Sequence, residues 1–501
     1  MQSQKILIVV GFKLTKYALS FIFFYLMVLF YEPHVIGTVK FAIALVTIFS
    51  FIFNLGFSVA HLKIYPEEED KAACIGTLLI FKGIFILASL VFYLSLLSLM
   101  NLESMILNII IIFIFEQIIQ GINSSMSNIL IADDQIIKGT FPWVVISSSK
   151  ITLIIIGLFL FPTNELTLAF IYLISTLVHT GFLGIYILSY KVKLPTIVLL
   201  RKYLHFTYPL IVSNIAVLIS GNIGIILINF WISTEAVAYY YAGDHLSVFR
   251  TIIPNVIGLV MISIFSKNIK EKNIEKNKEI IKKLSKYFCF LWGGIILLSF
   301  LYSDEVIIFF LSETYIPSIF IFNILILAHF VEVNDIAVYT DLKAKGLTKQ
   351  FSLIKFIGEI YNIILIIYFL APFGLNLGIN GLALSILFKY ITYTPVVRLI
   401  LWFKYGYSYN FGIFLNLIAG ILVFWLNSLY TINLDLSVHF YLMPIFIIVD
   451  IALYIGILYV IRGIKKEDFR YFKLFLNIKS LINMLYEDLA IKNNIFKDDN
   501  E

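Results

Sequence analysis

The residues of this chain that could do chemistry are ionisable side chains within long apolar stretches. A charged group at the depth of a membrane core is costly to bury, so it usually faces a cavity, a partner or a ligand. A basic group there could bind an anion, because Lys offers a point charge and Arg offers a planar fork that fits phosphate. An acidic group could bind a cation or a proton. The basic residues are Lys82, Lys150, Arg250, Lys355 and Lys389, and the acidic residues are Glu116, Asp244, Glu332, Asp335, Glu359 and Asp450.

Arg250 is the sharpest candidate for contact with an anion. It lies near the middle of its apolar stretch, where it is hardest for the side chain to reach the membrane surface. No acidic residue stands three or four positions away to pair with it along one helix. Its charge therefore needs an acid from another helix, water or an anionic ligand. Lys82 and Lys150 also lie deep in apolar stretches, and pairing with another helix is the alternative for them too.

Glu332 and Asp335 are three residues apart, which places both carboxylates on one face of a helix. Two like charges in a low dielectric disfavour each other, so such a pair could bind Na⁺ or a proton. It could equally neutralise basic partners. No cluster has the spacing of zinc ligands, so we expect no metal site and no cofactor apart from a coupling Na⁺ or H⁺.

Fourteen apolar stretches carry these side chains, and each is near the ~20 residues that cross a bilayer as a helix. The composition agrees, since 60% of the 501 residues are hydrophobic and 14% are charged, against about a quarter charged in a soluble domain. The sequence predicts an all-α polytopic membrane protein with fourteen transmembrane helices. The predicted spans are residues 9–30, 37–61, 73–98, 105–131, 139–161, 168–190, 205–230, 237–266, 287–303, 317–341, 350–370, 379–403, 409–429 and 438–461.

The connections between these spans alternate between those that carry Lys or Arg and those that carry neither. Positively charged connections stay on the cytoplasmic side. The alternation predicts a multi-pass protein of the cell membrane with both termini in the cytoplasm. The net charge of +6 reports this orientation and contact with anionic membrane lipids, and we expect no nucleic-acid binding. The connections without Lys or Arg are 31–36, 99–104, 162–167, 231–236, 304–316, 371–378 and 430–437.

Long basic connections over residues 191–204 and 267–286 suggest the domain organisation. The first separates two groups of six spans that start on the same side, which indicates a parallel pseudo-twofold repeat with a site between its halves. We expect lobes at residues 1–200 and 201–404, two extra helices at 405–462, and a cytoplasmic tail at 463–501. Apolar residues at helical spacing in the tail suggest an interfacial helix, and a solvated tail is the alternative.

Three short motifs stand near helix ends. The first is Glu32-Pro33-His34-Val35-Ile36-Gly37, with Asn54-Leu55-Gly56-Phe57-Ser58-Val59-Ala60 further on. The second is Tyr208-Pro209-Leu210 followed by Ser233-Thr234-Glu235-Ala236-Val237-Ala238-Tyr239-Tyr240, and the third is Gly378-Ile379-Asn380-Gly381-Leu382-Ala383-Leu384. In order and spacing they resemble the polysaccharide-flippase branch of the multidrug, oligosaccharidyl-lipid and polysaccharide exporter superfamily, although Glu32 and Pro33 stand in reversed order. With the fourteen predicted helices, the resemblance covers nearly the whole chain.

The motifs also have local physical explanations. Pro33 and Gly37 would end and restart helices at an outside turn, since Pro cannot continue a helix and Gly tolerates special backbone angles. Gly378 and Gly381 would let two helices pack closely. These explanations make no residue of the motifs a ligand contact.

The resemblance implies translocation of a polyprenyl-diphosphate-linked oligosaccharide from the cytoplasmic to the outer face of the membrane, through a water-filled cavity between the lobes. Superfamily members that move the lipid-linked peptidoglycan precursor use basic residues on helices 1, 2 and 8. Lys13 and Lys16, Lys40 and Arg250 occupy those helices here, although the lysines could also be flanking residues. Glycan-assembly enzymes are candidate partners. The expected substrate contacts are Arg250, Lys150, Lys82, Lys16 and Lys40, and the expected ion-coupling residues are Glu332 and Asp335.

A drug/cation antiporter of the same superfamily is the alternative. Its better-known proton-coupled members carry an acidic residue in helix 1, whereas this chain has no carboxylate before Glu32 and instead carries Lys13 and Lys16. That difference favours an anionic cargo. We expect no enzyme, because the outside connections are too short to hold an acceptor site with acid and base groups.

Overall fold

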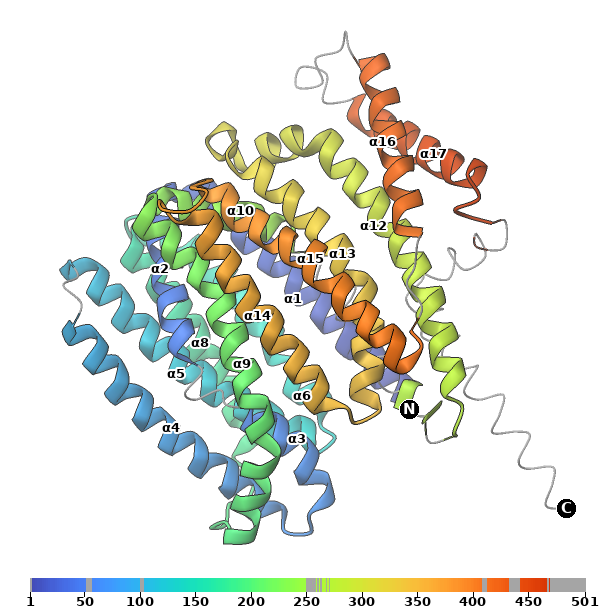
Figure 1. Ribbon diagram of the computed structural model, residues 1–501. Coiled ribbons are helices and arrows are strands. Elements are labelled where there is room, and N and C mark those ends of the chain that lie inside the picture. The colour runs from blue at the N-terminus through green and yellow to red at the C-terminus, as the bar shows by residue number, and fades with distance from the viewer. Residues whose placement is uncertain are drawn as a thin grey trace, which may run out of the picture. The chain divides into compact units, whose positions relative to one another are not determined.

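The computed structural model describes residues 2–50, 56–99, 103–248, 271–407, 412–431 and 442–465, together with positions 258, 261, 264–266, 268, 269 and 468. Within these ranges every regular element is helical (Figure 1). Eleven of the described helices are long and apolar enough to cross a membrane, or twelve if the bent pair Ser318–Val333 and Asp335–Ala344 forms one span. The described part of the chain is therefore all-helical, and the chain is a multi-pass membrane protein.

The count of fourteen spans remains a prediction. The predicted span 37–61 corresponds to α2 (Pro33–Phe49) and α3 (Phe57–Glu67), which are separated by residues outside the described ranges. The predicted span 237–266 begins in α10 (Thr234–Leu246) and continues largely outside the described residues.

The described helices group into two units. One contains residues Ile8–His245 and Lys349–Ser385, and we call it the first unit. It holds most of α1 (Gln2–Phe30), then α2 and α3, α4 (Lys71–Leu99), α5 (Ser104–Ala132), α6 (Ile136–Thr140), α7 (Pro142–Leu160), α8 (Glu165–Ile187), α9 (Ile197–Trp231), α10, α14 (Thr348–Leu370) and the start of α15 (Ile379–Tyr405). Helix α8 packs against α5 and α7, and α2 packs against α9. Asn362 of α14 donates a hydrogen bond to Ser220 of α9 at 2.8 Å.

The second unit contains residues Leu246–Thr348 and Ile386–Glu501, with Met1–Leu7. It holds α12 (Ile274–Leu311), η2 (Glu313–Tyr315), α13 (Ser318–Ala344), the rest of α15, α16 (Gly412–Thr431) and α17 (Met443–Val460). The buried Asp341 carboxylate accepts hydrogen bonds from Asn277 Nδ2 at 2.7 Å and from Tyr407, and it pairs with Lys345 Nζ at 2.7 Å. These contacts fix the start of α12 to α13 and to the end of α15. The predicted lobes at 1–200 and 201–404 remain a prediction.

Two predicted cytoplasmic connections are shorter in the structure than the sequence predicts. Helix α9 already begins at Ile197, and its N-cap Thr196 side chain accepts a hydrogen bond from the Leu199 amide. Helix α12 begins at Ile274, so residues 274–286 of the predicted 267–286 connection are helical. The pair Glu275 and Lys278, 2.7 Å apart and three residues apart in sequence, supports that helical start.

Candidate functional site

Two lysines meet on tyrosine rings inside the first unit. Lys40 of α2 donates a hydrogen bond from Nζ to the Tyr172 hydroxyl of α8 at 2.8 Å. Its Nζ also lies 3.9 Å from the ring centroid of Tyr241 in α10. Lys150 of α7 places its Nζ 4.1 Å from the centroid of Tyr172. Four helices thus bring two ammonium groups together around aromatic rings, and a cation over such a ring is stabilised without being neutralised.

Lys16 of α1 completes the group. Its Nζ lies 4.6 Å from the ring centroid of Trp143 in α7, and the Trp143 ring is 5.0 Å from the buried His179 ring. Lys16 and Lys150 both interact electrostatically with His179. We call Lys16, Lys40 and Lys150 the lysine cluster. All three were predicted as substrate contacts from sequence, and the structure places them in one unit.

The cluster carries more positive than negative charge among the described residues. Glu116 of α5 is the carboxylate that interacts electrostatically with one of the lysines, Lys150. It is buried, and its Oε1 already accepts hydrogen bonds from Thr176 at 2.9 Å and from Gln120 at 2.8 Å. Asp244 interacts with Tyr241. Among the described residues, three lysines near these two carboxylates form a site suited to an anion, because buried charges require compensation.

Two further substrate contacts, Lys82 and Arg250, were predicted from the sequence. Lys82 is 5% exposed on α4, and the contacts that define the lysine cluster do not include it. Arg250 lies outside the described residues. Both remain predictions.

The predicted coupling residues lie on α13 of the second unit, each beside a basic partner. Glu332 Oε2 is 2.7 Å from His329 Nδ1, and Asp335 Oδ1 is 2.7 Å from Arg398 Nε of α15. Neutralisation of basic partners was the alternative left open for this pair, and Asp335 has such a partner. Arg398 was not among the residues predicted from the sequence, although it is a charged residue within the predicted span 379–403 and could have been found there. Among the described residues, no group of three His, Cys, Asp or Glu side chains could hold a metal ion.

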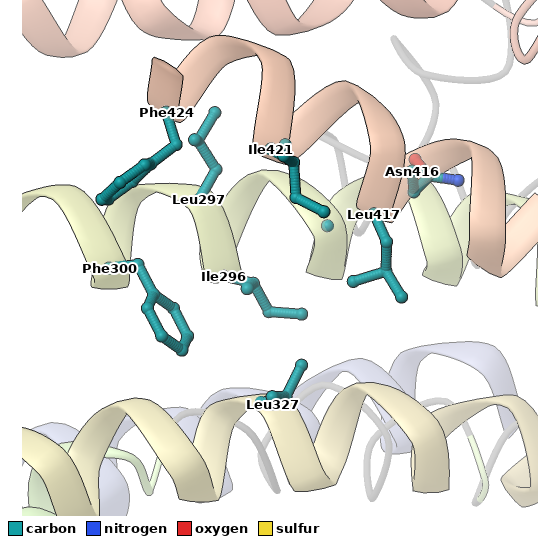
Figure 2. Close-up of a pocket in the computed structure, with 10 residues that line it drawn as sticks. Ile296, Leu297, Phe300, Leu327, Asn416, Leu417, Ile421 and Phe424 are labelled. Carbon is teal, nitrogen blue, oxygen red and sulfur yellow. The ribbon is translucent and has the colours of Figure 1, made fainter. Parts of the chain in front are cut away.

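An apolar groove of about 290 Å³ lies between α12, α13 and α16 of the second unit. Figure 2 shows Ile296 and Phe300 of α12, Leu327 of α13, and Leu417, Ile421 and Phe424 of α16 around it. Asn416 is the polar side chain of its lining, and the lining contains no charged residue. This groove suits hydrocarbon and cannot neutralise a phosphate, so the lysine cluster is the better candidate for an anion site.

The helical fold of the described residues defines a polytopic membrane protein. The chain belongs to the polysaccharide biosynthesis protein family, whose sequence profile matches residues 3–269, more than half of the 501 residues. No curated protein matches the chain.

Solved structures of the superfamily share the fold. The lipid II flippase MurJ, in an inward closed conformation, is 17% identical, with 90% of this chain and 98% of that chain covered and a TM-score of 0.71. An inward-facing multidrug resistance MATE family transporter of the MOP superfamily is 14% identical, with 79% and 97% covered and a TM-score of 0.65. A MOP superfamily transporter from Pyrococcus furiosus is 14% identical, with 80% and 97% covered and a TM-score of 0.59. At these identities the likeness shows the fold alone.

Proposed function

We propose that this protein translocates a polyprenyl-diphosphate-linked oligosaccharide from the cytoplasmic to the outer face of the cell membrane, where the glycan is assembled further. The lysine cluster is the observation that supports this cargo. A diphosphate carries adjacent negative charges, and these require several cations once water is removed. Membership of the polysaccharide biosynthesis protein family favours a glycan as the group that the diphosphate carries.

The drug/cation antiporter remains the alternative, and two observations weigh against it. The interior of the first unit presents lysines, which would repel an organic cation. In the second unit, Asp335 pairs with Arg398, and this pair carries little net negative charge. An organic cation would therefore gain less than an anion from the described side chains.

In this proposal the residues have separate roles. Lys16, Lys40 and Lys150 bind the diphosphate, and Lys82 and Arg250 are further contacts. Glu332 and Asp335 are the proposed coupling residues for Na⁺ or H⁺, since a proton or Na⁺ at Asp335 would weaken its attraction to Arg398. No covalent bond is made or broken. Membrane lipids surround the protein, and the glycan-assembly enzymes are its proposed partners.

The test uses cells whose surface polysaccharide depends on this protein. Lys40→Met and Lys150→Met keep the length of each side chain but remove its charge, and the double variant removes both charges. We expect lipid-linked oligosaccharide to accumulate and surface polysaccharide to fall, with the double variant worst and protein abundance unchanged. Lys193→Met is the control, because the Lys193 side chain is 65% exposed. Full surface polysaccharide in the double variant would refute the role of the lysine cluster.

A further inference from the structure

Tyr172 contacts two lysines of the cluster through different parts of its side chain. Its hydroxyl accepts the hydrogen bond from Lys40 at 2.8 Å, and its ring face lies under Lys150, 4.1 Å from the centroid. Lys40 Nζ is itself 5.2 Å from the same centroid. One side chain thus sets the positions of two ammonium groups that come from α2 and α7 and that repel each other.

The surrounding packing holds the Tyr172 ring in place. Phe23 of α1 meets it edge to face at 5.5 Å and 80°, and Phe113 of α5 does so at 5.7 Å and 68°. Tyr172 is 8% exposed, and such packing leaves a ring little freedom to turn. The positions of both lysines are therefore fixed by a rigid neighbour rather than by their own flexible stems.

Neither contact neutralises the charge of a lysine. A carboxylate in the place of Tyr172 would neutralise one ammonium group, whereas a hydroxyl oxygen and an aromatic face stabilise the cation and leave its net charge available. An arriving anion then meets two oriented cations whose contacts with Tyr172 do not neutralise them, and Glu116, the carboxylate that interacts with Lys150, already accepts hydrogen bonds from Thr176 and Gln120. Such preorganisation increases affinity by lowering the cost of ordering the site.

We propose that Tyr172 is the positioning residue that holds Lys40 and Lys150 as a two-cation clamp, and that this clamp selects a diphosphate ester over a monophosphate. The proposal rests on the proposed function. Two adjoining phosphates can engage one lysine each, whereas a single phosphate at either lysine leaves the other ammonium group without an anion.

The test measures binding of farnesyl diphosphate and farnesyl monophosphate to the purified, full-length protein in detergent. Tyr172→Phe keeps the ring under Lys150 but removes the acceptor for Lys40, and Tyr172→Leu removes both contacts. Tyr93→Phe is the matched control, because the buried Tyr93 hydroxyl of the same unit donates to the Val46 carbonyl at 2.7 Å and touches no lysine. Lys40→Met is combined with Tyr172→Phe to ask whether the tyrosine acts through that lysine.

We expect the wild type to prefer the diphosphate and Tyr172→Phe to lower that preference about ten-fold, the typical effect of one hydrogen bond to a charged group. Tyr93→Phe should leave the preference unchanged, and Tyr172→Phe should have no added effect once Lys40 is Met. This last result separates positioning from a general loss of packing.

Three results would overturn the proposal. An unchanged preference in Tyr172→Phe removes the positioning role. A ten-fold loss that persists in the Lys40→Met background shows that Tyr172 does not act through Lys40. If the wild type binds neither probe, the diphosphate cargo of the proposed function fails, and the clamp fails with it.

Discussion

Asp335 of α13 and Arg398 of α15 form a buried ion pair, with Oδ1 2.7 Å from Nε and side chains 4% and 3% exposed. Removing one partner of such a pair leaves a buried charge without compensation, and this costs about 3–5 kcal/mol. Replacing both partners by apolar residues of similar size is far less damaging.

The first prediction concerns this pair. Arg398→Met should lower the melting temperature of the purified protein sharply, and Asp335→Leu with Arg398→Met should recover much of the loss. Asp70→Asn is the control, because the Asp70–Lys193 pair is 3.2 Å apart but more than half exposed on both sides. If Arg398→Met melts like this control, the ion pair contributes little to stability. Loss of translocation in an equally stable Asp335→Asn would then favour ion coupling.

The second prediction is a pH dependence at Asp468. Burial alone would raise the pKa of this carboxyl, but hydrogen bonds from Lys286 Nζ and from the Lys465 amide outweigh burial and lower it. A carboxyl whose pKa is lower in the folded state stabilises the protein above its unfolded pKa of about 3.9, and this contribution is lost as the pH falls through the folded pKa.

Asp468→Asn should therefore lower the melting temperature at pH 7, by the equivalent of about 1 kcal/mol or less. The difference from the wild type should shrink as the pH falls below about 4. Glu313→Gln, at an exposed carboxylate, provides the control. A difference of the same size at both pH values would show that charge at Asp468 is not what stabilises the contact.

The third prediction concerns Gly37. A Cβ atom at Gly37 would lie 1.9 Å from the backbone oxygen of Thr234, so α2 and the start of α10 could not keep their present approach. Gly37→Ala should reduce the fraction of protein that elutes as a single species in detergent. Gly11→Ala is the control, since nothing lies within 4 Å of a Cβ there. Equal elution profiles for the two variants would mean that α2 and α10 pack less tightly than described.

The fourth prediction is the orientation in the membrane. Cys74 and Cys289 are buried, so single exposed cysteines can be added against a low background. In intact cells, an impermeant thiol reagent should label Thr163→Cys from outside and label Lys282→Cys only after the membrane is opened. Both positions are exposed in the structure. Labelling of Lys282→Cys in intact cells would contradict the cytoplasmic side assigned to the basic connections and, with it, the placement of both termini.

Burial cost explains why part of the site could be predicted from sequence. A lysine in an apolar stretch is conspicuous, and Lys150 could be predicted as a substrate contact on this ground alone. Lys16 and Lys40 were predicted from the family resemblance. The partners Tyr172 and Tyr241 could not be found in the same way, because the chain contains 30 Tyr and 47 Phe residues and no spacing distinguishes those that face a lysine. Which ring meets which cation depends on how α2, α7, α8 and α10 pack.

The glycines show the same division between local and tertiary causes. Gly37 was expected at a helix end, but it lies within α2. The close approach of Thr234 explains why this position needs a glycine. Gly378 was expected to pack closely, but nothing lies within 4 Å of a Cβ atom there. Its positive φ of 60° explains why glycine occupies this position. A Cβ atom at Gly381 would lie 2.7 Å from the Phe369 oxygen, so this glycine does permit a close approach, whereas Pro33 begins α2 instead of ending a helix. The sequence shows at which positions a glycine or proline is needed. Which residue packs against each of them is known only from the fold.

Transport by the purified protein in liposomes tests the central claim most directly. A polyprenyl-diphosphate-linked oligosaccharide is placed in the inner leaflet, and its arrival outside is followed with an impermeant enzyme that modifies the sugar. We predict that the protein accelerates this transfer over protein-free liposomes, and that the Lys40→Met, Lys150→Met double variant loses most of the acceleration. A wild-type rate equal to that of protein-free liposomes, together with exchange of an organic cation for Na⁺ or H⁺, would contradict the flippase and establish the antiporter instead.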